Sequence, residues 1–118
     1  MRIDIKPLSV NDAYRGRRFK TPEYKQYEHD LMLLLPKELE IPEGKLQVHF
    51  KFGLSSKLAD YDNPVKALQD IISRKYGFND NRIYKGTTEK VDVKKGNEFI
   101  EFVMQEYYEE KLKELSTG

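Results

Sequence analysis

The sequence predicts an α/β or α+β domain with a small mixed β-sheet, and three patterns carry this prediction. One stretch alternates apolar and polar residues, two stretches repeat apolar residues at helical spacing, and further extended stretches follow the second of these. The resulting order, with helices between and after strands, is typical of helices packed on a sheet. A chain of 118 residues has room for one compact domain, residues 1–118.

The first half of the chain predicts a short strand, a loop and a helix. Arg2–Ile5 alternates as a strand does, Pro7–Gly16 is rich in turn residues, and Arg17–Lys20 predicts a short extended piece. Thr21 is a typical helix N-cap and is followed by a proline at the first helical position. Apolar residues then recur at helical spacing until Pro36 ends the predicted helix.

The second half predicts a central strand followed by a second helix. Leu46–Leu54 alternates regularly, as a half-buried strand does. Asn63 is predicted to cap a helix that starts at Pro64 and ends before Gly77. Two strands, Arg82–Val93 and Glu98–Gln105, are predicted to be joined by a hairpin turn at Lys94–Asn97. A short charged helix is predicted for Tyr107–Leu115.

Composition narrows the class of protein. There are no cysteines, which excludes disulfides and cysteine-ligated zinc. No apolar run approaches the roughly 20 residues that cross a membrane, and the first residues lack an apolar signal core. These features predict a cytoplasmic protein without a membrane partner. The net charge is only +1, but residues 1–25 hold seven basic and three acidic side chains, which suits a partner that carries phosphates.

Carboxylates gather where the central strand passes into the second helix. Asp60 and Asp62 are two residues apart, and in an extended backbone such residues point to the same side. A bound cation would relieve their repulsion, and oxygen ligands favour Mg²⁺ or Mn²⁺. Asp80, after the helix, is a third candidate ligand, and Lys66 falls in the first helical turn. A metal ion and a lysine together supply the charge stabilisation that phosphodiester hydrolysis needs.

Other interpretations of this segment stay open. Aspartates before a helix are also common as cap residues, without any ligand. An EF-hand loop fits less well, because from Asp60 its sixth position would be Val65 rather than glycine and its twelfth Ile71 rather than glutamate. A nucleotide enzyme of the Walker type would need a glycine-rich phosphate loop, which the sequence lacks.

The ordered residues of this segment resemble the core of the RusA-type Holliday junction resolvases. Pro7–Asn11 is similar to the opening motif of that family, and the segment RRFKTPEY resembles the one that follows it. The resemblance spans the chain from about Pro7 to about Phe102. Its core positions are Asp60, Asp62, Asn63, Lys66, Gly77, Asp80 and Ile83.

The resemblance implies a RusA-like homodimer that resolves four-way (Holliday) DNA junctions by paired, Mg²⁺-dependent nicks, in DNA recombination and repair. By position, Asp60, Asp62 and Asp80 would bind the metal. Lys66 would be the catalytic base or an electrostatic partner. A symmetric dimer would present two identical sites to a junction of matching pseudo-twofold symmetry. No organic cofactor is expected.

Residues near the N-terminus are predicted to contact DNA: Asn11, Arg15, Arg17, Arg18 and Lys20. Phe19 is predicted to pack in the core, with stacking on a base as the alternative. His29 and His49 have no histidine or cysteine at ligand spacing and are predicted to be structural or surface residues. Two rival functions remain, a nuclease that prefers other branched DNA and a non-catalytic DNA-binding module.

Overall fold

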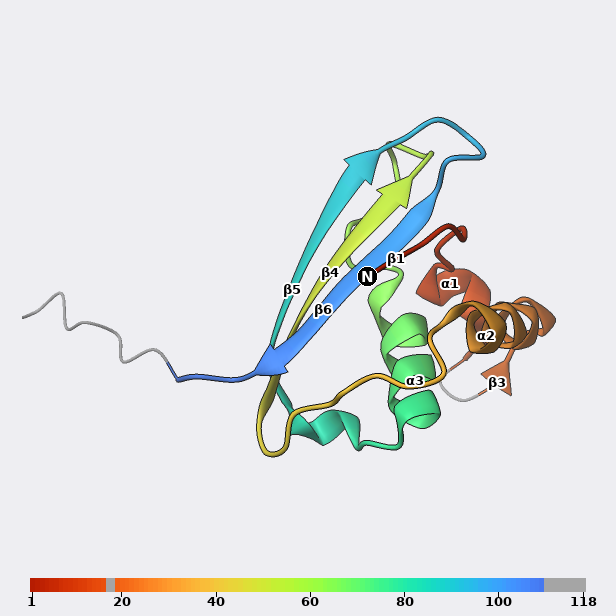
Figure 1. Cartoon of the computed structure of the whole chain (residues 1–118). Coiled ribbons are helices and arrows are strands. Elements are labelled where there is room, and N and C mark those ends of the chain that lie inside the picture. Colours follow the sequence, from red (N-terminus) through yellow and green to blue (C-terminus); the bar gives the residue numbers. More distant parts are fainter. Residues whose placement is uncertain (17–18, 110–118) are drawn as a thin grey trace, which may run out of the picture.

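The computed structural model describes residues 1–16 and 19–109 and is built on a four-stranded mixed sheet (Figure 1). In spatial order the strands are β1 (Arg2–Ile3), β6 (Phe99–Glu106), β4 (Leu46–Leu54) and β5 (Ile83–Asp92). β4 runs parallel to β5 and antiparallel to β6. The predicted fold class, α+β with a small mixed sheet, is therefore confirmed.

Helices cover one side of this sheet (Figure 1). They are α1 (Val10–Ala13), α2 (Pro22–Leu34) and α3 (Val65–Tyr76), followed by the 3₁₀ turn η1 (Asp80–Arg82). α3 connects the parallel strands β4 and β5, which need such a crossover because a tight turn cannot join them. Among the described residues, no helix combines the length and the apolar character that crossing a bilayer requires.

Local chemistry explains where the two longer helices begin and end. The Thr21 hydroxyl accepts a hydrogen bond from the Tyr24 amide at 3.2 Å, as an N-cap should. α3 starts one residue later than predicted, and no side chain caps it, so the prediction that Asn63 caps this helix is wrong. α3 ends at Gly77, whose φ of 69° is easy only for glycine.

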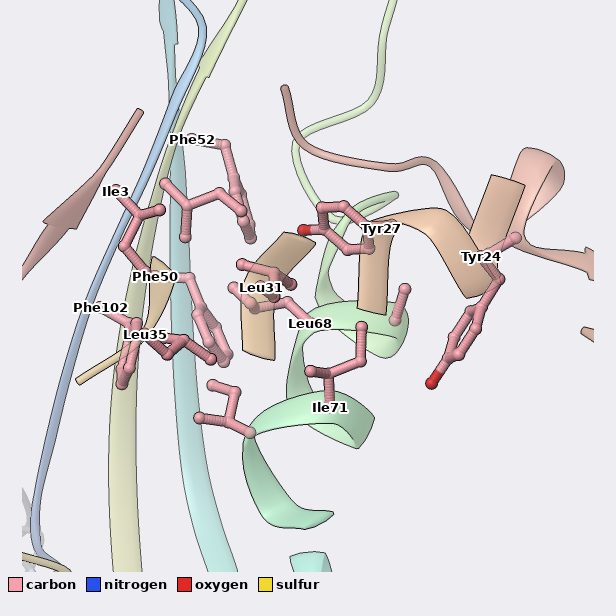
Figure 2. Packing of buried hydrophobic residues seen from close by; sticks show 14 of the residues in the cluster. Ile3, Tyr24, Tyr27, Leu31, Leu35, Phe50, Phe52, Leu68, Ile71 and Phe102 are labelled. Carbon is pink, nitrogen blue, oxygen red and sulfur yellow. The ribbon is translucent and has the colours of Figure 1, made fainter. Parts of the chain in front are cut away.

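The core lies between the helices and one face of the sheet (Figure 2). Phe50 and Phe52 of β4 are fully buried there, because alternate residues of a strand point to the same face. Leu31 of α2 and Leu68 of α3 complete the packing from the other layer. The opposite face of the sheet carries exposed polar side chains such as His49, as the alternation predicts, and His29 is also exposed.

Two predictions about the N-terminal segment need correction. The segment Pro7–Gly16 is not all loop, because it contains α1 and the first strand of a small hairpin. This hairpin pairs β2 (Tyr14–Arg15) with β3 (Phe19–Lys20). Phe19 does not pack in the core, since 76% of its surface is exposed. A strand of two residues is too short to show a period, which is why the sequence pattern missed it.

The C-terminal predictions are correct in their strands and wrong in how the strands pair. β5 and β6 do not form a hairpin, because β4 lies between them in the sheet. Tyr107, Tyr108 and Glu109 are not helical. The remainder of the predicted terminal helix lies outside the described residues. Strand periodicity identifies a strand but carries no information about its neighbour, so the sheet order had to come from the structure.

Gly53 is predicted to be intolerant of any side chain. A Cβ atom at this position would overlap the ring of Phe99, which lies directly opposite on β6. Gly53→Ala should therefore lower the free energy of unfolding by about 1–3 kcal/mol, because the ring must move out of its packed position. Denaturant unfolding measures this change. Gly86→Ala on the neighbouring strand is the matched control, since its Cβ would meet only Val48 at 3.9 Å. Equal losses in both variants would contradict the explanation.

Candidate functional site

The segment before α3 is a pair of turns rather than an extended strand. The Asn63 amide donates to the Asp60 carbonyl at 3.3 Å, and the Val65 amide donates to the Asp62 carbonyl at 3.1 Å. The expectation that Asp60 and Asp62 point to the same side assumed an extended backbone, and the backbone of this segment is not extended. The two exposed carboxylates line different hollows of the surface.

Asp62 and Lys66 line one open groove of about 700 Å³ between α3 and β5. Its floor includes Gly86 and Thr88, which the helices leave partly uncovered. The Lys66 ammonium lies 4.6 Å from the centre of the Tyr14 ring, a cation–π distance that holds the charge at the start of α3. The structure thus brings together the predicted metal ligand and the predicted catalytic lysine.

Asp60 lines a second, smaller pocket of about 200 Å³ with Ser9 and Asp12. The N-terminal segment is tied to this place, because the Val10 amide donates to the Asn63 carbonyl at 2.9 Å. The two segments in which the sequence resemblance is concentrated therefore lie side by side. Sequence reasoning missed Asp12, since a residue expected in a loop gave no sign that it would line the same pocket as Asp60.

Asp80 is not brought to the other two carboxylates within one copy of the chain. Asp62 precedes α3 and Asp80 opens η1 after it, at the far end of a helix of 12 residues (Figure 1). A helix of that length extends about 18 Å. Within residues 1–16 and 19–109, no group of three acidic, histidine or cysteine side chains is placed to hold a metal ion.

The residues predicted to contact DNA have different surroundings in the structure. Arg15, on the β2–β3 hairpin, is exposed, and so is Asn11 on α1. Lys20 is partly neutralised, because its ammonium lies 4.0 Å from an Asp70 carboxylate oxygen and 4.9 Å from the centre of the Tyr24 ring. The predictions for Arg17 and Arg18 lie outside the described residues.

Two tyrosines join this hairpin to the helices. The rings of Tyr14 and Tyr24 are 5.4 Å apart, and the Tyr24 hydroxyl donates to Asp70 at 2.5 Å while it accepts from Arg74 at 2.7 Å. Burial and the bonded carboxylate raise the pKa of Tyr24 well above its ordinary value. Burial, with the charge of Asp70, also raises the pKa of Tyr14. Both tyrosines therefore stay neutral. Tyr24 packs against Tyr14, and the Tyr14 ring contacts the Lys66 ammonium.

The arrangement offers carboxylate oxygens, an ammonium group and an exposed arginine around the start of α3. This set suits a polyanion bound through a hard cation, because carboxylates bind the cation and basic groups bind phosphate. A search of protein-family models finds none that matches the chain, and no curated protein matches it either.

Proposed function

We propose that this chain is a cytoplasmic, RusA-like, Mg²⁺-dependent endonuclease that resolves four-way DNA junctions as a homodimer, in recombination and repair. The observation that carries the proposal is the shared groove of Asp62 and Lys66, beside the Lys66–Tyr14 contact that leads to the basic hairpin. A carboxylate and an ammonium at one groove can serve the metal and the phosphate of a single scissile bond.

The residues of one copy fit such a metal only in part. Asp60 and Asp62 come from one turn but line separate hollows, so their side chains would have to rotate before both carboxylates could hold one hard cation. A bound Mg²⁺ would supply polarisation of the phosphoryl oxygen and activation of the attacking water. Lys66 then holds the charge that grows on the phosphate, with the Tyr14 ring keeping its ammonium in place.

Asp80 can complete this ligand set only from a second copy of the chain. It lies beyond the far end of α3 from Asp60 and Asp62, so no side-chain rotation joins the three in one copy. In a twofold dimer, the same geometry can place Asp80 of each copy at the site of the other. Dimerisation then becomes a condition for metal binding as well as for paired cuts.

The proposal is tested by incubating a mobile four-way junction with the full chain and Mg²⁺. We expect paired, symmetric nicks that disappear with EDTA, while a linear duplex of the same sequence stays intact. Flap and fork substrates in the same assay identify a preference for other branched DNA. Junction binding without any Mg²⁺- or Mn²⁺-dependent nicking would contradict the proposed activity.

That last outcome would favour the second candidate function, a non-catalytic DNA-binding module. One observation supports this alternative: the part of the chain that the structure describes has no three-ligand metal cluster. In such a module the aspartates before α3 would serve only as residues of backbone turns. The exposed Arg15 would still bind phosphate.

Arg15→Gln is predicted to weaken binding to every DNA substrate to a similar extent. An exposed hairpin arginine contacts phosphate rather than base edges, so its loss removes about one released counterion. The slope of log affinity against log salt concentration should therefore fall by about one. Fluorescence anisotropy over a salt series measures this. Lys25→Gln, an exposed lysine of α2, is the control; the same fall in slope in both variants would argue against a specific role for the hairpin.

A further inference from the structure

The outer edge of β5 is free in the part of the chain that the structure describes. β5 is the last strand of the sheet order and is 10 residues long. Long free edges expose unpaired N–H and C=O groups, and proteins usually protect them with short strands, proline, bulges or charged side chains. The opposite edge is protected by the two-residue strand β1, whereas β5 is long and contains no proline. Its pairing with β4 is irregular only between Ile83 and Lys85, and its exposed charges have both signs.

The sequence of β5 is complementary to itself in one antiparallel register. When two copies pair with Thr87 opposite Thr87, Lys85 of each copy lies opposite Glu89 of the other. A shift by one residue in one direction places Lys85 opposite Lys90, and a shift in the other direction places it opposite Thr88, so both shifts lose the pairing of opposite charges. Opposite charges stabilise directly opposed positions of a sheet, and like charges destabilise them. The charge pattern therefore selects the register centred on Thr87.

We infer that the outer edge of β5 is the surface through which two copies of this chain associate, antiparallel and centred on Thr87. Lys85, Thr87 and Glu89 are all exposed, so the pairing needs no rearrangement of the core. In this register the side chains of opposed residues keep the same face in both copies. The two sheets join into one of eight strands, with both α3 helices on the same side.

This pairing also explains how the site can be completed, a step that rests on the proposed function. The β4 strands of the two copies lie three strand spacings apart, about 14 Å, so the grooves of Asp62 and Lys66 face each other across the paired β5 strands. In an antiparallel pair, the start of β5 in one copy lies beside the end of β5 in the other copy. Asp80 comes shortly before the start of β5 in the sequence. The Lys90 ammonium donates to the Ala59 carbonyl at 2.6 Å, so the turn of Asp60 lies near that end.

Charge reversal on β5 tests the inference by sedimentation equilibrium over a concentration series. Lys85→Glu and Glu89→Lys each oppose like charges at two positions, so each should raise the dimer dissociation constant about tenfold or more. The double variant, Lys85→Glu with Glu89→Lys, restores opposite charges and should dimerise like the original chain. An equal mixture of the two single variants should form heterodimers in preference to either homodimer. Lys25→Glu, far from β5 on α2, is the control for net charge.

The outcomes separate this inference from the proposed function. A monomeric chain at all concentrations, or a dimer that neither reversal weakens, would overturn the β5 interface even if junctions are still nicked with Mg²⁺. A dimer that responds as expected without any metal-dependent nicking would uphold the interface and refute the nuclease. Circular dichroism checks that each variant is folded. If one single variant is unfolded, the double variant and the other single variant still test the β5 interface.

Discussion

Asp62→Asn should abolish Mg²⁺-dependent nicking of four-way junctions, with a loss of at least about 100-fold in single-turnover rate. Asp62 shares its groove with Lys66, and the change removes a charged metal ligand while it keeps the size of the side chain. The basic hairpin is untouched, so the affinity for the junction, measured by gel shift without metal, should stay within about twofold of the original.

A control variant and a binding measurement show whether a loss of nicking by Asp62→Asn comes from a lost metal ligand. Asp4→Asn removes the same charge from an exposed residue outside the groove, whose carboxylate pairs with Arg2, and should leave the rate unchanged. Junction cleavage by Asp62→Asn at the normal rate would show that the site is elsewhere. Loss of binding together with loss of cleavage would show instead that Asp62 supports the fold or the DNA surface.

Mixing Asp62→Asn with Asp80→Asn should restore nicking that neither variant shows alone. If each metal site takes Asp62 from one copy and Asp80 from the other, a heterodimer of the two variants has one intact site and one site that lacks both ligands. Random exchange of subunits makes about half of the dimers mixed, so about a quarter of all sites should be active. The restored activity should consist of single nicks, because each mixed dimer has one working site.

The same experiment decides whether the site is completed within one copy. Were Asp80 to act with Asp62 of its own chain, each copy in the mixture would still carry one defective site, and mixing would restore nothing. Normal activity of Asp80→Asn alone would remove Asp80 from the ligand set. The first arrangement is the expected one under the proposed function, because α3 separates the two residues within a copy.

The long helices and strands with a regular apolar pattern could be predicted from the sequence. The two-residue strands and the order of strands in the sheet could not. β4 was predicted at its observed bounds because its nine residues alternate between apolar and polar, which is the pattern of a half-buried strand. The hairpin of β2 and β3 has two residues in each strand, which is too few for any period, so Phe19 was wrongly expected in the core. Sheet order depends on contacts between distant segments, and the place of β4 between β5 and β6 shows in no local pattern.

The candidate site was predicted in its residues but not in its geometry. The sequence pointed to Asp62 and Lys66, and the structure places both on one groove. The backbone between Asp60 and Asp62 was assumed to be extended, but it forms two turns that are closed by hydrogen bonds to the Asp60 and Asp62 carbonyls. Spacing along the chain gave no warning that a whole helix would separate Asp80 from its expected partners.

The hydrogen bond from the Val10 amide to the Asn63 carbonyl also gives the protein an internal reporter. An amide proton exchanges with solvent deuterium only when its bond opens, and the rate of exchange measures the free energy of that opening. Val10 stands outside the groove and carries no charge, yet its proton is held by the turn that contains Asp60 and Asp62. The lifetime of one backbone proton near the N-terminus therefore follows the rigidity of the distant acidic turn, independently of any DNA or cleavage assay.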